Sequence, residues 1–105
     1  MGPKTGKLVT ELETVISLLE SCAVDHWADW FKNSKSLLEN GDFSGIEQVL
    51  SAFGGMGSFN DLHICRANGH DIDDKDAAAV NQRLQESSGT IFDLANDIRK
   101  AAKMR

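Results

Sequence analysis

A regular repeat of apolar and small residues in the last third of the chain constrains the fold more than any other feature. Its members are separated by alternating steps of three and four residues, and they are Ala77, Val80, Leu84, Ser87, Ile91, Leu94, Ile98 and Ala101. This spacing places all of them on one face of an α-helix, in a heptad pattern about 25 residues long. Such a face must be covered by other helices, so the repeat predicts a helical bundle.

The segment Ser87-Ser88-Gly89 lies inside this repeat and also has the composition of a turn. Because glycine destabilises a helix interior by about 1 kcal/mol relative to alanine, two shorter helices joined at Gly89 are an alternative. A turn would normally shift the register, yet Leu84, Ile91 and Leu94 maintain it. We therefore favour one long helix.

Helical periodicity predicts three further helices earlier in the chain. Their predicted bounds are about Thr5 to Ser21, Asp25 to Asn40-Gly41, and Asp42 or Ser44 to Gly54-Gly55. We expect Asp25 to cap the second helix, Gly54 or Gly55 to end the third with a positive φ, and Asp73 or Asp74 to cap the fourth. The predicted fold is all-α: a single domain over residues 1–105, built as a bundle of four principal helices with an ordered loop between helices 3 and 4.

Length and charge exclude several classes of protein. With 105 residues the chain is too short for a Rossmann or barrel enzyme, and it has no apolar run of the roughly 20 residues that a membrane span needs. The last seven residues contain four of the 11 basic residues and none of the 16 acidic ones, so residues 1–98 have a net charge of −9. This sign disfavours nucleic acid and favours a basic protein as the partner.

The two cysteines indicate the compartment. Cys22 and Cys65 are 43 positions apart, and the N-terminal segment lacks the continuous apolar core of a secretory leader. Reduced thiols in the cytoplasm are therefore the expected state.

Several residue types that bind metals are concentrated in the segment between the third and fourth helices. They are His63, Cys65, His70, Asp71 and Asp73. A structural zinc site normally needs two pairs of ligands, and the second pair is missing, so we expect no metal and no cofactor. A metal- or small-ligand-binding module that uses the loop from Gly54 to Asp73 is retained as an alternative.

The glycine-rich segment from Gly54 to Ser58 does not have the context of a phosphate-binding loop. No strand precedes it, and no Lys-Ser or Lys-Thr pair follows it. A structural role is favoured, in which the glycines end the third helix while Met56 and Phe59 close the end of the bundle, and direct binding is the alternative. We also expect a helical turn capped by Ser58 and a short extended segment from Leu62 to Ile64.

Aromatic residues are concentrated in the second helix. The spacing of Trp27, Trp30 and Phe31 is typical of a buried stripe. A tryptophan that is partly exposed beside Asp25 and Asp29 would instead form a binding hot spot with an acidic rim.

The run Gly-Gly-Met-Gly-Ser-Phe-Asn-Asp-Leu at residues 54–62 resembles the signature of a small, largely uncharacterised bacterial domain family. In that family a few amphipathic helices precede the motif, as they do here. The resemblance implies a helical domain without an established enzymatic activity. In size and character the members are similar to the antitoxin or immunity proteins that accompany secreted bacterial toxins.

Together these observations predict a non-enzymatic protein-binding domain, in its most concrete form an immunity or antitoxin-type inhibitor that docks an acidic surface on a basic toxin. The candidate contact residues are Asp25, Asp29 and Trp30, or Met56, Ser58, Asn60, Asp61 and His63. A structural homodimer formed through the C-terminal heptad helix is a further alternative, because a stripe of this length can pair between chains.

Overall fold

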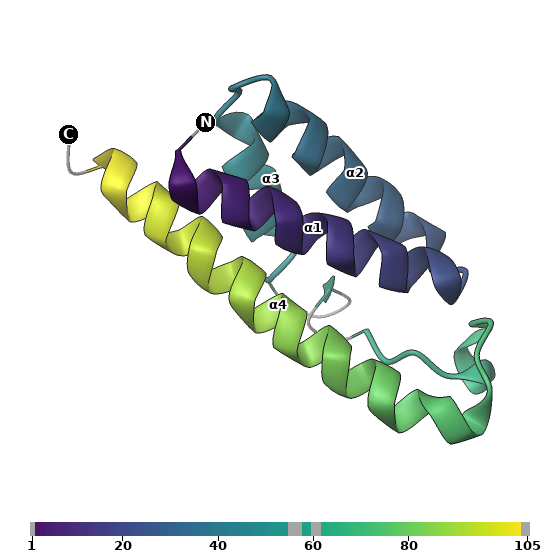
Figure 1. Cartoon of the computed structure of the whole chain (residues 1–105). Helices are drawn as coiled ribbons and strands as arrows, with labels where there is room; N and C mark the ends of the chain where they lie inside the picture. The colour runs from purple at the N-terminus through teal and green to yellow at the C-terminus, as the bar shows by residue number, and fades with distance from the viewer. Residues whose placement is uncertain (1, 55–57, 60–61, 104–105) are drawn as a thin grey trace.

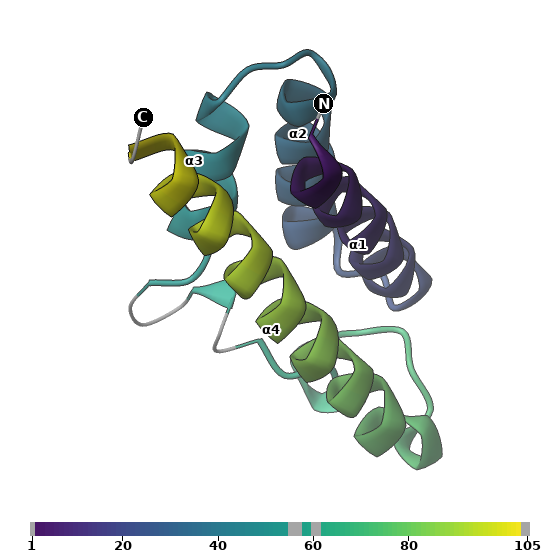
Figure 2. The ribbon, with the colours of Figure 1, turned by 60° about the vertical axis from the view of Figure 1, so that its left-hand side comes forward.

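The computed structural model describes residues 2–54, 58–59 and 62–103, and within these ranges it contains four α-helices and no strand. The helices are α1 (Pro3–Ser21), α2 (Asp25–Glu39), α3 (Ser44–Ser51) and α4 (Asp74–Lys103), and a short 3-10 helix spans Arg66–Asn68. Helix α1 packs against α2 and α4, and α3 packs against the same two helices from the other side (Figures 1 and 2). The predicted all-α bundle of four helices is confirmed.

Helix α4 continues without a break through Ser87-Ser88-Gly89, as predicted. Its 30 residues correspond to about 45 Å, close to the 47 Å long axis of the molecule. The helix begins at Asp74, directly after Asp73, and runs antiparallel to α1 (Figure 1). At the shared end of the two helices, Lys4 Nζ lies 3.7 Å from Asp97 Oδ2.

The heptad stripe of α4 packs inside the chain. Leu84, Ser87 and Ile91 are buried, and Leu94 and Ile98 pack against the core as partly buried residues. The Ser87 hydroxyl donates a hydrogen bond of 2.7 Å to Glu11 Oε1 on α1, so this polar member of the stripe has a partner. The stripe is thus occupied by contacts within one molecule, and pairing between two chains stays a prediction.

The turn between α1 and α2 corrects the prediction that Asp25 caps the second helix. Asp25 is the first residue of α2, and Val24 occupies the cap position. Val24 is buried, and its N–H donates to the Leu19 carbonyl at the end of α1. Ala23 adopts a positive φ of 57°, which lets the chain turn sharply enough to bury Val24. The end of α1 therefore decides where α2 begins, and Asp25 contributes through its charge in the first turn.

The turn between α2 and α3 follows the prediction. Helix α2 ends at Glu39, and Gly41 has a φ of 74°. The N–H groups of Gly41 and Asp42 donate to the carbonyls of Leu38 and Leu37, which completes a Schellman motif. Asp42 Oδ1 accepts the N–H of Ser44 at 2.9 Å, and this hydrogen bond lowers the pKa of the Asp42 carboxyl.

The end of α3 differs from the prediction that a glycine with positive φ terminates it. The helix ends at Ser51, Ala52 stays in the right-handed region, and Gly54 does not have a positive φ, while Gly55 lies outside the described residues. The reason is that other donors satisfy the last carbonyls: the Phe53 N–H bonds to Leu50, and the Phe59 N–H bonds to Ala52 at 2.8 Å.

The chain then runs beside α4 toward its N-terminus (Figure 2). Ile64 is fully buried there, and its N–H and C=O both bond to the side-chain amide of Asn81 on α4. The Leu62 N–H donates to the Phe59 carbonyl, as in the expected helical turn. The predicted cap by Ser58 is not observed, because the buried Ser58 hydroxyl has no hydrogen-bond partner among the described residues. The segment from Leu62 to Ile64 pairs with no strand, since Asn81 takes the place of a neighbouring strand.

Within the ranges that the structure describes, none of the helices is both long enough and apolar enough to span a membrane.

Candidate functional site

Aromatic side chains from α2, the segment that follows α3, and α4 form a continuous series of ring contacts, which we call the aromatic ladder. Its members are His26, Trp27, Phe59, Phe53 and Phe92. Successive ring centroids along it are 4.8, 5.5, 5.7 and 5.5 Å apart, and most of the contacts are edge-to-face or tilted. Such pairs add stability beyond the burial of their area. Phe59 is buried, in agreement with its predicted role in closing the bundle, while Phe92 is 40% exposed.

Trp30 lies beside the ladder and is held in place by α3. Its indole N–H donates to the Gln48 carbonyl at 3.0 Å, and its ring centroid lies 5.6 Å from that of Trp27. The Asn33 amide also binds the Gln48 side chain, at 2.9 Å. Trp30 is partly buried: the ring packs on the core and is still partly exposed. Its role as a binding hot spot stays a prediction.

Asp25 and Asp29 are both exposed and lie four residues apart, on one face of α2. The nearby Lys32 forms its ion pair with Glu20 of α1, at 2.6 Å. The hydrogen bond that Lys32 donates to the Glu20 carboxylate is the main cause of the raised pKa of Lys32, and the charges of Asp29 and Asp25 raise it further. Among the described ion pairs none involves Asp25 or Asp29, and both residues are exposed.

The second predicted contact patch is supported less well. Ser58 is buried, with 9% of its surface exposed, because it directly precedes the core residue Phe59. Its side chain is therefore not available at the surface, which corrects the prediction for this residue. His63 is exposed, and its carbonyl accepts a hydrogen bond from Asn68. Met56, Asn60 and Asp61 lie outside the described residues.

The alternative prediction, a metal site in the loop before α4, requires its five candidate ligands to lie close together. Among the residues described, no three His, Cys, Asp or Glu side chains come close enough to hold a metal ion. His70 Nδ1 instead accepts the N–H of Cys65 at 3.2 Å, and the Asp71 N–H donates to the Cys22 carbonyl. Both cysteines are free thiols. The first hydrogen bond holds the segment's own fold, and the second attaches the segment to the end of α1. Both give it a structural role.

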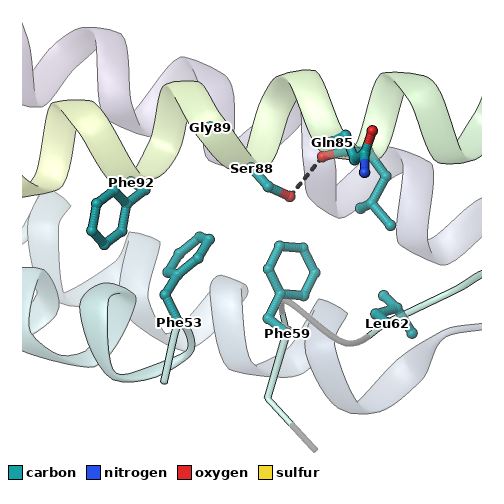
Figure 3. Close-up of a pocket in the computed structure, with 8 residues that line it drawn as sticks. Phe53, Phe59, Leu62, Gln85, Ser88, Gly89 and Phe92 are labelled. Atoms are coloured by element: carbon teal, nitrogen blue, oxygen red, sulfur yellow. Dashed lines mark hydrogen bonds between the residues drawn. The ribbon is translucent and has the colours of Figure 1, made fainter. Parts of the chain in front are cut away.

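A groove of about 510 Å³ opens between α4 and the chain that passes beneath it (Figure 3). We call it the α4 groove, and its lining residues are Phe53, Phe59, Leu62, Leu84, Gln85, Ser88, Gly89 and Phe92. The wall of the groove that α4 forms is shallow at Ser88 and Gly89, because these residues are small. The Ser88 hydroxyl is turned back on its own helix and donates to the Leu84 carbonyl at 2.6 Å.

Sequence reasoning did not find this groove. The pair Ser88-Gly89 indicates the groove, but the sequence analysis considered these residues only as a possible turn. Once the helix is known to continue, two small residues on its surface mean a local depression. The walls come from Phe53 and Phe59, and the distance between these residues and α4 in the sequence hides their proximity.

The fold and these surfaces define a small helical-bundle protein that presents an acidic and aromatic face. The chain belongs to the family described as Domain of unknown function (DUF6966), whose model matches residues 20–73, just over half of the chain. The match covers α2, α3 and the segment leading to α4, and it includes Trp30 and Phe59 but not Phe92. No curated protein and no solved structure matches the chain.

Proposed function

We propose that this protein is a non-enzymatic protein-binding domain that docks the acidic face of α2, formed by Asp25, Asp29 and Trp30, on a basic protein. The observation that carries the proposal is the fixed position of Trp30. Its indole is bonded to Gln48 and packed against Trp27 while it stays partly exposed, and the exposed Asp29 directly precedes it in α2. Tryptophans in such positions supply much of the binding energy of protein interfaces.

Preorganisation supports this proposal. A side chain that is already held in its bound position loses little conformational entropy when a partner binds. The Gln48 contacts to Trp30 and Asn33 hold the α2 face against α3, so the surface exists before binding.

The charge distribution supports a basic partner. Residues 1–98 have a net charge of −9, because four of the basic residues fall after position 98. Lys32 is the basic residue nearest to Asp29 along α2, and Glu20 engages it. Long-range attraction would therefore speed the approach of a cationic surface.

In its finer form, the proposal is an immunity or antitoxin-type inhibitor that acts in the cytoplasm and covers the basic active site of a toxin. The small size of the chain, its acidic charge and the resemblance of residues 54–62 to the bacterial motif support this form. The two free thiols are consistent with a reducing compartment.

The test uses the tagged full chain to capture proteins from the source cells at low salt, with mass spectrometry of what is retained. Asp29→Lys is compared with Asp97→Lys, which makes the same change in net charge near the opposite end of α1 and α4. We expect one dominant basic protein, bound by wild type and Asp97→Lys, released by salt, and lost with Asp29→Lys. Equal retention by both variants, or retention that does not change with salt, would contradict the proposal.

A further inference from the structure

We infer that the α4 groove is a second contact site, which receives a large apolar side chain from a basic segment of the partner protein. The inference rests on the proposed function, and it adds which side chains of the partner are recognised and where. The groove lies at the Phe92 end of the aromatic ladder, whereas His26 and Trp27 form the other end.

The shape and chemistry of the groove suit an apolar side chain. Figure 3 shows the rings of Phe53, Phe59 and Phe92 pointing into the space beside α4, with Leu62 at the far end. A volume of about 510 Å³ is within the usual range of ligand sites. Phe92 is 40% exposed, so an occupant would cover apolar surface that water now contacts.

Gly89 makes the groove accessible. A Cβ atom added at this position would meet no atom within 4 Å, so the glycine leaves open space rather than a close contact. Glycine has a cost in the interior of a long helix, and the packing of α4 does not require it here. Gly89 thus leaves the groove open to the side chain of another molecule.

Two exposed carboxylates on α4, near Gly89 but outside the lining of the groove, favour a basic occupant. Glu86 and Asp93 lie about one turn before and one turn after Gly89, so the three residues are neighbours on the surface of α4. Both carboxylates are exposed, and no ion pair among the described residues includes them. A partner segment with Lys or Arg on either side of its apolar residue would place its cations beside these carboxylates.

The binding test uses the isotope-labelled full chain and three acetylated, amidated peptides, observed by NMR. The first peptide is Lys-Arg-Phe-Arg-Lys, the second replaces Phe with Ala, and the third is Glu-Asp-Phe-Asp-Glu. We expect the first peptide to cause saturable shifts at the amides of Ser88 and Gly89 and at the ring of Phe92, with a Kd on the order of millimolar, and the other two to bind about tenfold more weakly or not at all. Equal shifts from the first two peptides, or no saturable shift in the groove, would overturn the inference.

Two variants test the site itself. A Cβ at position 89 meets no atom within 4 Å and leucine favours the helix, so Gly89→Leu should stay folded. Its side chain should occupy the groove and lower peptide binding by about tenfold or more. Gly6→Leu is the matched control, because Gly6 of α1 also has open space around it and does not line the groove. Unchanged binding by Gly89→Leu would place the peptide elsewhere and refute the inference.

Charge variants separate this inference from the proposed function. The double variant Glu86→Lys/Asp93→Lys should abolish peptide binding in the groove, whereas Asp29→Lys should leave it intact. If the peptide binds in the groove and Asp29→Lys captures the partner as well as wild type does, only the proposal that the partner binds the α2 face is refuted. Partner capture that depends on Asp29 but not on Gly89→Leu would refute only the groove.

Discussion

The side-chain amide of Asn81 forms hydrogen bonds with both backbone groups of Ile64. The Ile64 N–H donates to Asn81 Oδ1 at 2.9 Å, and Asn81 Nδ2 donates to the Ile64 carbonyl at 2.8 Å. The same nitrogen also donates to the Ala77 carbonyl within α4. Ile64 is fully buried in a segment without a strand partner, so one helical side chain satisfies the backbone groups that a sheet would otherwise pair.

Replacing Asn81 should therefore destabilise the protein. Asn81→Ala leaves two buried backbone groups of Ile64 unpaired, and we expect the free energy of unfolding to fall by about 1–3 kcal/mol. Urea denaturation measures this change. Gln82→Ala is the control, since Gln82 is exposed and bonds only to Glu86 on its own helix, and it should change stability by less than about 0.5 kcal/mol. Similar losses in the two variants would show that the Ile64 contact contributes little.

Two helical glycines should respond to alanine with opposite signs. A Cβ on Gly45 would lie 2.9 Å from Leu38 Cγ and 3.0 Å from the Ser34 carbonyl oxygen, because α3 approaches α2 closely there. Gly45→Ala should lower stability by about 1–3 kcal/mol. Gly89→Ala meets no atom and should raise stability by about 0.5–1 kcal/mol. Thermal unfolding of both variants checks the prediction, which fails if both changes have the same sign.

Ala23 should be replaceable by glycine with a gain in stability. Its φ of 57° is unfavourable for a residue with a Cβ, so Ala23→Gly should stabilise the protein by about 1 kcal/mol. Ala78→Gly, at an exposed position within α4, should instead destabilise it by about the same amount. Chemical denaturation of the pair measures the difference. A loss in both variants would mean that the entropy of the unfolded chain outweighs the strain at Ala23.

The hydrogen bond that the Asp42 carboxylate accepts from Ser44 should make stability depend on acid pH. Since the pKa of Asp42 is lowered in the folded protein, its contribution is present above the ordinary value of 3.8 and is lost as the pH falls through the lower, folded pKa. The advantage of wild type over Asp42→Ala should therefore be constant near neutral pH and shrink below about pH 3.8. Asp42→Asn keeps an acceptor oxygen without a titrating group, so its advantage over Asp42→Ala should not change with pH. Denaturation curves across this pH range provide the measurement.

The parts of the fold that follow from local patterns were predictable. The stripe from Ala77 to Ala101 predicted one long helix across Gly89, and Asn40-Gly41 predicted the end of α2. Both depend on residues a few positions apart, which are neighbours on a helix or in its cap. The helix boundaries that sequence reasoning misplaced, at Asp25 and Gly54, are those where backbone hydrogen bonds of the flanking turn replace the expected aspartate and glycine caps.

The candidate site was predictable only in part. The exposure of Asp25 and Asp29 follows from their charge, while the partial burial of Trp30 depends on Gln48, a residue of another helix. The burial of Ser58 was missed because it depends on the anchoring of Phe59 between the rings of Phe31 on α2 and Phe53, which follows α3.

The sequence by itself determined that this chain is a bundle of amphipathic helices with an acidic surface, because periodicity and charge are properties of neighbouring residues. Only the tertiary structure decided which residues far apart in the sequence lie together in the core and around the α4 groove. Ser87 bonds to Glu11 across 76 positions, and the ring of Phe53, just after α3, lies 5.5 Å from the ring of Phe92 on α4. Contacts of this kind form when packed helices meet, and no local pattern records which residues will be brought together.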